Sequence, residues 1–272
     1  MSEHSKFPYS ACVVIGSSRG LGTALADQLL QCGSPVVAGF SRSSRLGDHH
    51  PDQAAGVYLH TQLDIAAPDS SAEIRRQIAA LPRGPLLVIF NAACIAEDVH
   101  EDGTLDPDIF EQINRTGIGG LGQTVVAVQE RLLSDGGMLL AISSINALVP
   151  SISEKMVAYP ASKAYLTMLI RSLALHWSGK VKVSAIHLGH IGGTGNRFFS
   201  RWLNPSYLQA ATWIVTYAVS GRRVVEGAYP WPYRFVYCYL LKCIPDHLYA
   251  FCLSKLLTGN SRLKCWIAPA KK

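Results

Sequence analysis

The sequence predicts an α/β fold with a doubly wound parallel sheet, in a single domain followed by a C-terminal helical extension. Short apolar runs alternate with segments of helical period along most of the chain, which is typical of a parallel sheet covered on both faces. No repeat or low-complexity linker interrupts this series. The 272 residues are also enough to bury a large core.

The strands and helices follow from these two patterns. Strands are expected where apolar runs lie between Gly, Pro or polar clusters, at Ser10–Ile15, Pro35–Phe40, Gly56–Leu63, Pro85–Phe90, Gly137–Ser143 and Lys180–Leu188. Helices are expected at Leu21–Gln31, Ser70–Leu81, Pro107–Leu133 and Val157–His176. We place the domain at residues 1–230, ending after a last strand near Arg223-Val224-Val225, and an apolar, basic extension at 231–272.

Composition excludes several classes of protein. The seven cysteines are odd in number and never spaced as C-x-x-C, so we expect reduced, packed thiols and no metal site. His187 and His190 are interpreted as a chance pair at a strand end. The absence of a secretory signal and of an 18-residue apolar run favours a cytoplasmic protein.

The net charge of +6 is unevenly distributed. Residues 222–272 contain nine Lys or Arg against two Asp or Glu, whereas the first 221 residues contain sixteen against seventeen. No nucleic-acid motif accompanies this basic segment. Its apolar helices around Pro245 could cover a substrate cleft, contact a second subunit or lie on an anionic membrane surface.

The segment YPASK places Tyr159 and Lys163 four residues apart at the start of an expected helix. Pro160 is tolerated in a first helical turn, so the helix should begin close to Tyr159. A phenol beside an ammonium at a helix N-terminus should have a pKa below its usual value of about 10, which suits acid and base chemistry. An ordinary amphipathic helix with a polar pair is the alternative.

A glycine-rich turn, GSSRGLG, joins the first expected strand to the first helix. Glycines allow a tight turn, and a helix N-terminus offers N–H groups to phosphate, so a dinucleotide could bind there. The same letters contain the G-x-S-x-G pattern of serine hydrolases, with Ser18 as nucleophile. That alternative requires an oxyanion loop from an earlier strand, and only 17 residues precede Ser18.

Together these motifs resemble the short-chain dehydrogenase/reductase family over roughly residues 7–230. Gly16, Gly20 and Gly22 match its TGxxxGxG loop with Ile15 in place of Thr, and Asp64 matches the acid near the adenine. Asn91-Ala92-Ala93 matches the NNAG segment with Phe90 and Ala93 departing from it, and Tyr159 and Lys163 match YxxxK.

The resemblance implies a Rossmann fold and a catalytic tetrad. Asn114 and Ser144 stand where the family has its helix Asn and its Ser, although Ser144 precedes Tyr159 by fifteen residues and Ser143 is a minor alternative. Leu188-Gly189 replaces Pro-Gly, and Thr194 stands one residue late. The implied cofactor-binding residues are Gly16, Ser18, Arg19, Gly20, Leu21, Gly22, Ser41, Arg42, Asp64, Ile65, Asn91, Ala92, Tyr159, Lys163, Gly189, Ile191 and Thr194.

Four glycines crowd the helix that carries Asn114, at positions 117, 119, 120 and 122. Each should cost about 1 kcal/mol relative to Ala in a helix interior. Close packing against a neighbouring helix, or a bend at Asn114, would compensate. The third possibility is that the helix simply breaks.

The resemblance implies an oxidoreductase that interconverts a carbonyl and an alcohol with a nicotinamide cofactor. Ser41 replaces an acidic residue at the end of the second strand, and Arg42 and Arg19 favour a 2′-phosphate, so NADP(H) is expected. Arg42 and Arg45 as plain solvated charges are the alternative. Phe198, Phe199 and Trp202 suggest a hydrophobic substrate, although they could instead be core or dimer contacts. A homodimer or homotetramer is expected; dehydration, epimerisation and non-catalytic cofactor binding stay open.

Overall fold

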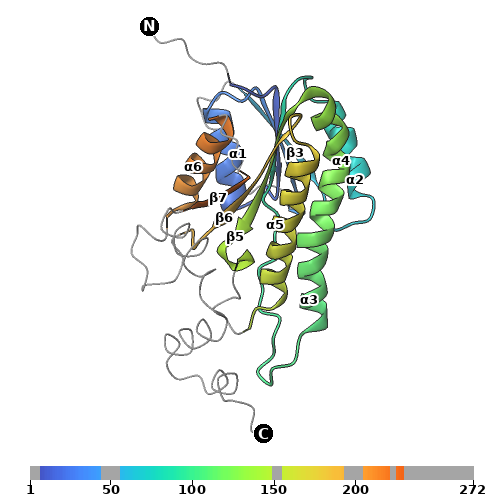
Figure 1. Ribbon diagram of the computed structural model, residues 1–272, viewed down its shortest axis with the longest axis vertical. Coiled ribbons are helices and arrows are strands. Elements are labelled where there is room, and N and C mark those ends of the chain that lie inside the picture. Colours follow the sequence, from blue (N-terminus) through green and yellow to red (C-terminus); the bar gives the residue numbers. More distant parts are fainter. Residues whose placement is uncertain (1–6, 44–55, 149–154, 193–204, 221–224, 230–272) are drawn as a thin grey trace.

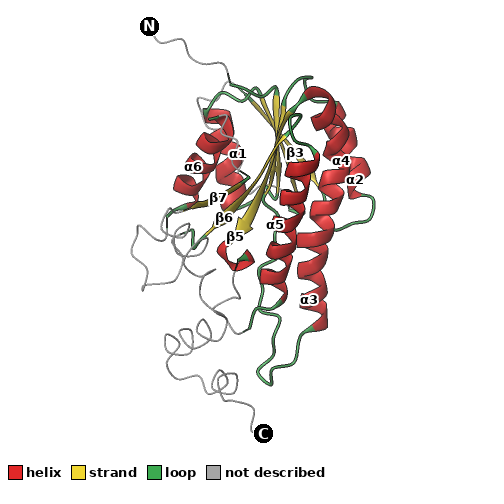
Figure 2. Ribbon diagram, in the orientation of Figure 1, coloured by secondary structure: helices red, strands yellow, loops and turns green. Residues whose placement is uncertain are grey.

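The computed structural model describes residues 7–43, 56–148, 155–192, 205–220 and 225–229. There, seven parallel strands form one sheet in the order β3-β2-β1-β4-β5-β6-β7 (Figure 1). The strands are β1 Ala11–Ile15, β2 Val36–Ser41, β3 Val57–Gln62, β4 Leu86–Phe90, β5 Gly137–Ser144, β6 Lys182–Leu188 and β7 Glu226–Tyr229. Helices cover both faces (Figure 2), which confirms the doubly wound fold.

Each face of the sheet has its own hydrophobic core. Helices α1 (Leu21–Gln31) and α6 (Tyr207–Val219) pack on one face. Helices α2 (Ser70–Ala79), α4 (Gly120–Asp135) and α5 (Ala158–His176) pack on the other. Strands β1 and β4 are buried along their whole length, because a central parallel strand has a helix layer on either side.

The expected helix Pro107–Leu133 is instead three consecutive pieces. Helix α3 (Pro107–Asn114) passes into a π-helical turn at Arg115–Gly119 and then into α4. A Cβ on Gly117 would lie 3.0 Å from the Cβ of Ser162 on α5, and one on Gly120 would lie 2.5 Å from Ile65 Cδ1. Both explanations for the glycines therefore hold, since the backbone widens directly after Asn114 and two glycines allow close packing.

Two other expectations are corrected. The sequence pattern predicts no helix after β6, yet α6 begins with a capping box in which Ser206 and Gln209 exchange hydrogen bonds. The last strand is expected at 223–225, whereas the described strand β7 starts at Glu226, where the chain pairs with Ala185 of β6; of the expected residues only Val225 is described, and it precedes the strand. Small Gly227 and Ala228 fit this buried position beside α6.

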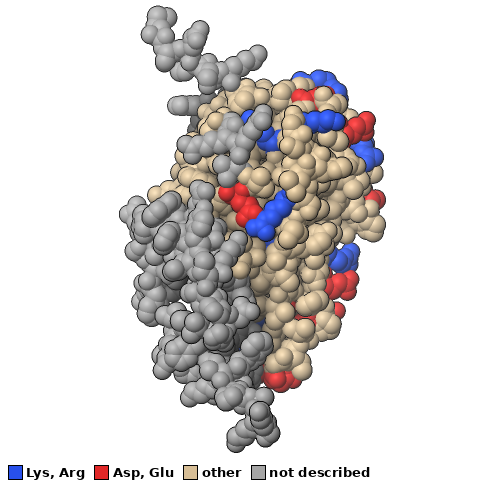
Figure 3. Space-filling view, viewed as in Figure 1, with Lys and Arg blue, Asp and Glu red and all other residues tan. Residues whose placement is uncertain are grey.

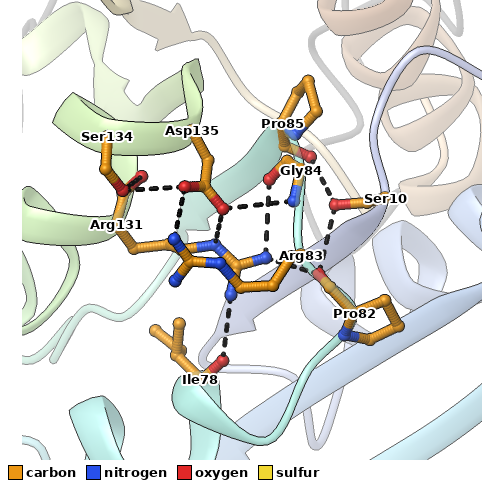
Figure 4. A network of polar contacts seen from close by, with 9 residues as sticks. All are labelled: Ser10, Ile78, Pro82, Arg83, Gly84, Pro85, Arg131, Ser134 and Asp135. Carbon is orange, nitrogen blue, oxygen red and sulfur yellow. Dashed lines mark hydrogen bonds and ion pairs between the residues drawn. The ribbon is translucent and has the colours of Figure 1, made fainter.

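A polar network holds the amino ends of β4 and β5 together, at the opposite end of these strands from their carboxyl ends. The buried Arg131 guanidinium contacts the main-chain oxygens of Ile78, Pro82 and Gly84, and its Nε lies 2.8 Å from the Asp135 carboxylate (Figure 4). Asp135 also accepts from the Gly84 N–H, from Arg83 and from Ser134. The network ties the loop before β4 to the end of α4.

The described cysteines are free thiols. Cys12 is buried, and burial raises its pKa to about 12. Cys32 is exposed, so the expectation of packed thiols is wrong there. The described ranges contain no group of three or more His, Cys, Asp or Glu placed to hold a metal ion. Among those same ranges, every helix is too short or insufficiently apolar to cross a bilayer.

In Figure 3, basic and acidic side chains lie close to one another at the top, along the right edge and near the centre, and most of the described surface between them is uncharged. Residues 231–272, most of the basic C-terminal segment, lie outside the described ranges. Arg45, Thr194, Phe198, Phe199, Trp202 and the proposed strand residues Arg223 and Val224 also lie outside them.

Candidate cofactor and catalytic site

The predicted site residues gather at the carboxyl edge of the sheet. The glycine loop follows β1, Asn91 follows β4, Ser144 ends β5 and Gly189 follows β6. Because β1, β4, β5 and β6 are neighbours in a parallel sheet, their carboxyl ends meet at one edge. The strand order reverses between β1 and β4, and ligands of doubly wound folds bind at such a point.

The glycine loop has the backbone geometry of an anion cradle. Gly16 and Gly20 have φ of 85° and 56°, in the left-handed region that glycine tolerates. A Cβ on Gly22 would lie 1.8 Å from the carbonyl oxygen of Gly16, so no larger residue fits. The N-terminus of α1 has no side-chain cap, which leaves its N–H groups to a bound anion. These residues fit the pyrophosphate of a dinucleotide.

Asn91 supports this loop from β4. Its Nδ2 donates to the carbonyl oxygen of Gly16 over 3.2 Å, and its main-chain N–H donates to Ile15 over 2.9 Å. The loop is held from β3 as well, because Tyr58 donates to the Ser17 hydroxyl over 3.0 Å. Ala92 backs Gly16 closely, with its Cα 3.0 Å from a Cβ built there. The predicted residues Asn91 and Ala92 thus lie directly against the loop.

The end of β2 carries the predicted cofactor-selecting residues. The Ser41 hydroxyl donates to the Ser43 carbonyl over 2.8 Å and lies 2.8 Å from His60 Nε2. Arg42 and Arg19 are exposed. The end of β2 therefore presents one exposed guanidinium, that of Arg42, and no acidic side chain at positions 41 and 42, and the glycine loop presents a second exposed guanidinium, that of Arg19.

Asp64 and Ile65 follow β3. Asp64 is exposed and its carboxylate accepts from the Ala66 N–H over 3.0 Å, which shapes a turn. Ile65 is buried against Gly120 at the start of α4. This turn brings Asp64 to the carboxyl edge, the position predicted for it.

The Tyr159 and Lys163 pair lies in the first turns of α5, as predicted. Helix α5 begins at Ala158, so Pro160 stands in its first turn. Lys163 is 4% exposed; its Nζ donates to the Ile142 carbonyl over 2.8 Å and lies 5.8 Å from the centre of the Tyr159 ring. Burial lowers the pKa of Lys163 to about 8.

The expected direction of the Tyr159 pKa is wrong for this structure. Burial raises the pKa of the phenol above its usual 10, and a hydrogen bond with Ser144 opposes that rise. The expectation rested on the neighbouring ammonium alone, whereas loss of water around a 9% exposed phenol disfavours the phenolate more strongly. Tyr159 therefore stays protonated at neutral pH.

The two adjacent serines point to different partners. The Ser144 side chain forms a hydrogen bond with Tyr159, and its Oγ also accepts a hydrogen bond from the Asn146 N–H over 3.2 Å. Ser143 lies 2.9 Å from the Thr167 hydroxyl in the core between β5 and α5. This geometry favours Ser144 over Ser143 as the serine beside Tyr159.

Asn114 is the last residue of α3, and the π-helical turn begins directly after it. It is partly buried on a helix that packs against α5. Single π-turns are frequent at functional sites because they redirect a side chain. Asn114 thus lies on the element that neighbours the Tyr159 helix.

Sequence reasoning missed the residue that anchors α5. Asp98 is 0% exposed, and its carboxylate accepts from the N–H groups of Val157 and Ala158 over 2.8 and 2.7 Å. These are the first amides of the helix that carries Tyr159. The two segments lie 59 residues apart in sequence, so no local pattern reveals the cap.

Tyr207 was also missed. Its ring lies 2.6 Å from a Cβ built on Gly192 and 3.4 Å from one built on Gly20. Gly189 donates from its N–H to Tyr229, and Ile191 packs against the core that contains α1. Tyr207 therefore lies between the glycine loop and the segment after β6; a capping box beside it was the available signal.

Comparison with known proteins shows the family to which the chain belongs. Residues 10–202 match the family model described as short chain dehydrogenase. A versicolorin reductase of Emericella nidulans is 29% identical over 196 residues, which cover 70% of this chain and 72% of the relative. A mouse 3-oxoacyl-[acyl-carrier-protein] reductase is 28% identical over 181 residues, covering 66% and 75%.

A Burkholderia cenocepacia short chain dehydrogenase in complex with NADP has the same fold, with a TM-score of 0.73 at 19% identity. The match covers 94% of this chain and 100% of that chain. The chain belongs to the short-chain dehydrogenase/reductase family of oxidoreductases. This family binds NAD or NADP on a Rossmann fold. Because the matched residues include Ser18, the GSSRG segment belongs to this family and not to a serine hydrolase.

Proposed function

We propose that the protein is an NADP(H)-dependent oxidoreductase that interconverts a carbonyl and a secondary alcohol on a hydrophobic small molecule. The observation that carries the proposal is the Tyr159 phenol, which forms a hydrogen bond with Ser144 and has the Lys163 ammonium 5.8 Å from the centre of its ring. These groups lie at the same sheet edge as the glycine loop. A proton donor beside a dinucleotide cradle is what carbonyl reduction needs.

The nicotinamide, when bound, supplies or accepts the hydride. Tyr159 donates a proton to the carbonyl oxygen during reduction and withdraws it during oxidation. The raised pKa of Tyr159 keeps it in its donor form, which suits reduction. Ser144 holds the substrate oxygen, and the charge of Lys163 stabilises a phenolate as it forms. Asn114 holds a water for proton relay.

Cofactor selection follows from charge at the end of β2. Arg42 and Arg19 pair with a 2′-phosphate, and Ser41 leaves room for it where an acid would repel it. A charged hydrogen bond contributes about 1.5–3 kcal/mol, so Arg42→Ala should weaken NADPH binding roughly tenfold or more and leave NADH binding unchanged. Arg76→Ala, on the distant α2, is the matched control.

The decisive binding experiment compares the dissociation constants of NADPH and NADH. Tighter binding of NADPH is expected, together with a reversed preference in Ser41→Asp. A wild-type preference for NADH would overturn the cofactor assignment. The family chemistry would still stand.

The substrate is proposed to be a hydrophobic ketone or aldehyde. The two relatives above are named as reductases, which supports the reductive direction. Screening aldehydes, ketones and secondary alcohols for a change in NADPH absorbance tests this. If no carbonyl is consumed although NADPH binds, the non-catalytic regulator becomes the better account. Formation of a product without net consumption of NADPH would point to dehydration or epimerisation.

A homodimer or homotetramer is proposed from the outer surfaces of α4 and α5. These helices expose apolar side chains, with Leu175 82% and Met168 58% exposed. Such surfaces on neighbouring helices favour a protein contact. Light scattering should give a mass of two or four chains, and Met168→Glu should reduce it. Three roles of residues 231–272 stay predictions: covering the substrate cleft, contacting a second subunit or lying on a membrane surface. The cytoplasmic location also stays a prediction.

A further inference from the structure

A partly buried polar cluster lies between α5 and the last strands of the sheet, with a fully buried histidine at its centre. His187 on β6 is 0% exposed. Its Nδ1 lies 3.2 Å from the main-chain oxygen of Ser144, and its Nε2 lies 3.2 Å from Glu226 Oε2 on β7. The Glu226 carboxylate also pairs with Arg171 on α5. The cluster therefore links three strands and one helix through a single imidazole.

Both ring nitrogens of His187 face oxygen atoms that can only accept. The Ser144 carbonyl has no proton to give, and Glu226 is a carboxylate. Hydrogen bonding from His187 lowers the pKa of Glu226 to about 2, and Arg171 adds to this against the effect of burial. An imidazole donates from both nitrogens only when both carry a proton. Donation to Ser144 and to Glu226 at once therefore requires a proton on each ring nitrogen of His187.

The oxygen that His187 contacts belongs to the residue that bonds to Tyr159. Ser144 is the last residue of β5 and pairs with Leu188 of β6. Beyond it the chain enters a 3₁₀ turn at Ile145–Ala147, whose first free N–H is capped by Ser144 Oγ. Ser144 thus makes contacts with its carbonyl oxygen and with its hydroxyl. The carbonyl and the hydroxyl branch from the same Cα, so a hydrogen bond that fixes the carbonyl also restricts the backbone from which the hydroxyl projects.

We infer that His187 is a positioning residue: by donating from Nδ1 to the Ser144 carbonyl and from Nε2 to Glu226, it fixes the end of β5 and so holds the Ser144 hydroxyl beside Tyr159. Other polar groups around β5 and α5 hold neighbouring atoms. Ser143 bonds to Thr167, and Lys163 donates to Ile142. The inference rests on the proposed function, in which Ser144 holds the substrate oxygen.

Two conservative substitutions separate positioning from simple packing. In His187→Asn the amide nitrogen lies three bonds from Cα, as Nδ1 does, so it can still donate to Ser144. In His187→Gln it lies four bonds from Cα, as Nε2 does, so it can donate to Glu226 and leaves the Ser144 carbonyl without this donor. Both variants remove the aromatic ring, and both leave Glu226 paired with Arg171.

The expected result is a split in kcat between the two variants. With NADPH and a carbonyl substrate found by screening, His187→Asn should stay within about fivefold of wild type, and His187→Gln should lose roughly a hundredfold, the typical cost of misplacing a group by 1 Å. The Kd for NADPH should stay unchanged in both. His176→Gln, at the exposed end of α5, is the control for loss of a histidine. Equal kcat values in the Asn and Gln variants would overturn the inference.

A second measurement keeps the inference testable if either variant fails to fold or no substrate is found. Nitrogen-15 NMR of histidine-labelled wild-type protein should show protons on both ring nitrogens of His187, and Glu226→Gln should shift those signals. A bare ring nitrogen on His187 would contradict the two-donor geometry. This readout needs no turnover, so a failure of the proposed function is seen separately, as NADPH binding without consumption of any carbonyl.

Discussion

Asp98 makes a sharp prediction because its carboxylate is buried and has a defined task. It accepts the N–H groups of Val157 and Ala158 over 2.8 and 2.7 Å at the start of α5. Hydrogen bonds to a charged group contribute about 1.5–3 kcal/mol each. Asp98→Ala should therefore lower the free energy of unfolding by about 3 kcal/mol or more, since two amides lose a buried acceptor. At 2–4 °C per kcal/mol, that is a fall in Tm of roughly 6–12 °C.

The same change should reduce turnover, because Tyr159 follows Ala158 directly and depends on the first turn of the helix. We expect kcat to fall at least about tenfold at a temperature where the variant is fully folded. Asp98→Asn keeps one acceptor oxygen and should lie between Ala and wild type. Urea denaturation followed by circular dichroism gives the stability, and NADPH absorbance gives kcat.

Asp106 provides a matched control. It caps α3 by accepting from Asp108 and Ile109 over 3.0 Å each, but it is more exposed than Asp98. Asp106→Ala should cost only about 1 kcal/mol, the usual cost of losing a helix cap. An Asp98→Ala protein that unfolds within 0.5 kcal/mol of wild type would refute the reasoning about the buried cap.

Three further predictions concern charge, the cofactor loop and the distant network. The pKa of about 8 at Lys163 lies below the usual 10.5, so the ammonium is present below pH 8 and kcat/KM for reduction should fall above pH 8. Between pH 8 and 10.5 only the unfolded state binds this proton, so the contribution of Lys163 to stability rises with pH over that range. Gly22→Ala should weaken NADPH binding at least tenfold because its Cβ meets Gly16 O at 1.8 Å, whereas Gly122→Ala, in open space, should stabilise α4 by about 1 kcal/mol. Arg131→Met should cost roughly 1–3 kcal/mol by leaving main-chain acceptors unpaired, with the Kd for NADPH unchanged.

Each of these has a contrary outcome. A flat reduction profile up to pH 10 would remove the Lys163 charge from the mechanism. Unchanged NADPH binding in the Gly22 variant would show that the loop can open at no cost. An Arg131 variant as stable as wild type would mean that water replaces the guanidinium.

The sequence predicted the elements that depend on local pattern. Strand and helix periods located six of the seven strands within a few residues, and α1 matches its expected bounds throughout. The motifs also predicted that Gly16, Ser144, Tyr159 and Lys163 lie at one edge of the sheet, because the carboxyl ends of parallel strands meet there. The glycines after Asn114 raised the possibility of a bend, and the structure shows a π-turn.

The features that it missed depend on distant partners or on burial. The Asp98 cap joins segments 59 residues apart, and His187 needs Glu226 from another strand before its ring has two partners. The direction of the Tyr159 pKa was wrong because a neighbouring Lys is visible in a sequence, whereas the loss of solvent around a phenol is not. Helix α6 was missed although its capping box was readable.

The central claim is that Tyr159 supplies the proton for carbonyl reduction at a site that also binds NADPH. Its most direct test measures kcat and the NADPH Kd of Tyr159→Phe beside wild type, at a pH below 8. The Phe variant should fold and bind NADPH with a Kd within about twofold, since the phenol is absent from the phosphate cradle. Its kcat should fall by about 10²–10⁴, the usual contribution of a positioned acid. A kcat close to wild type would contradict the account.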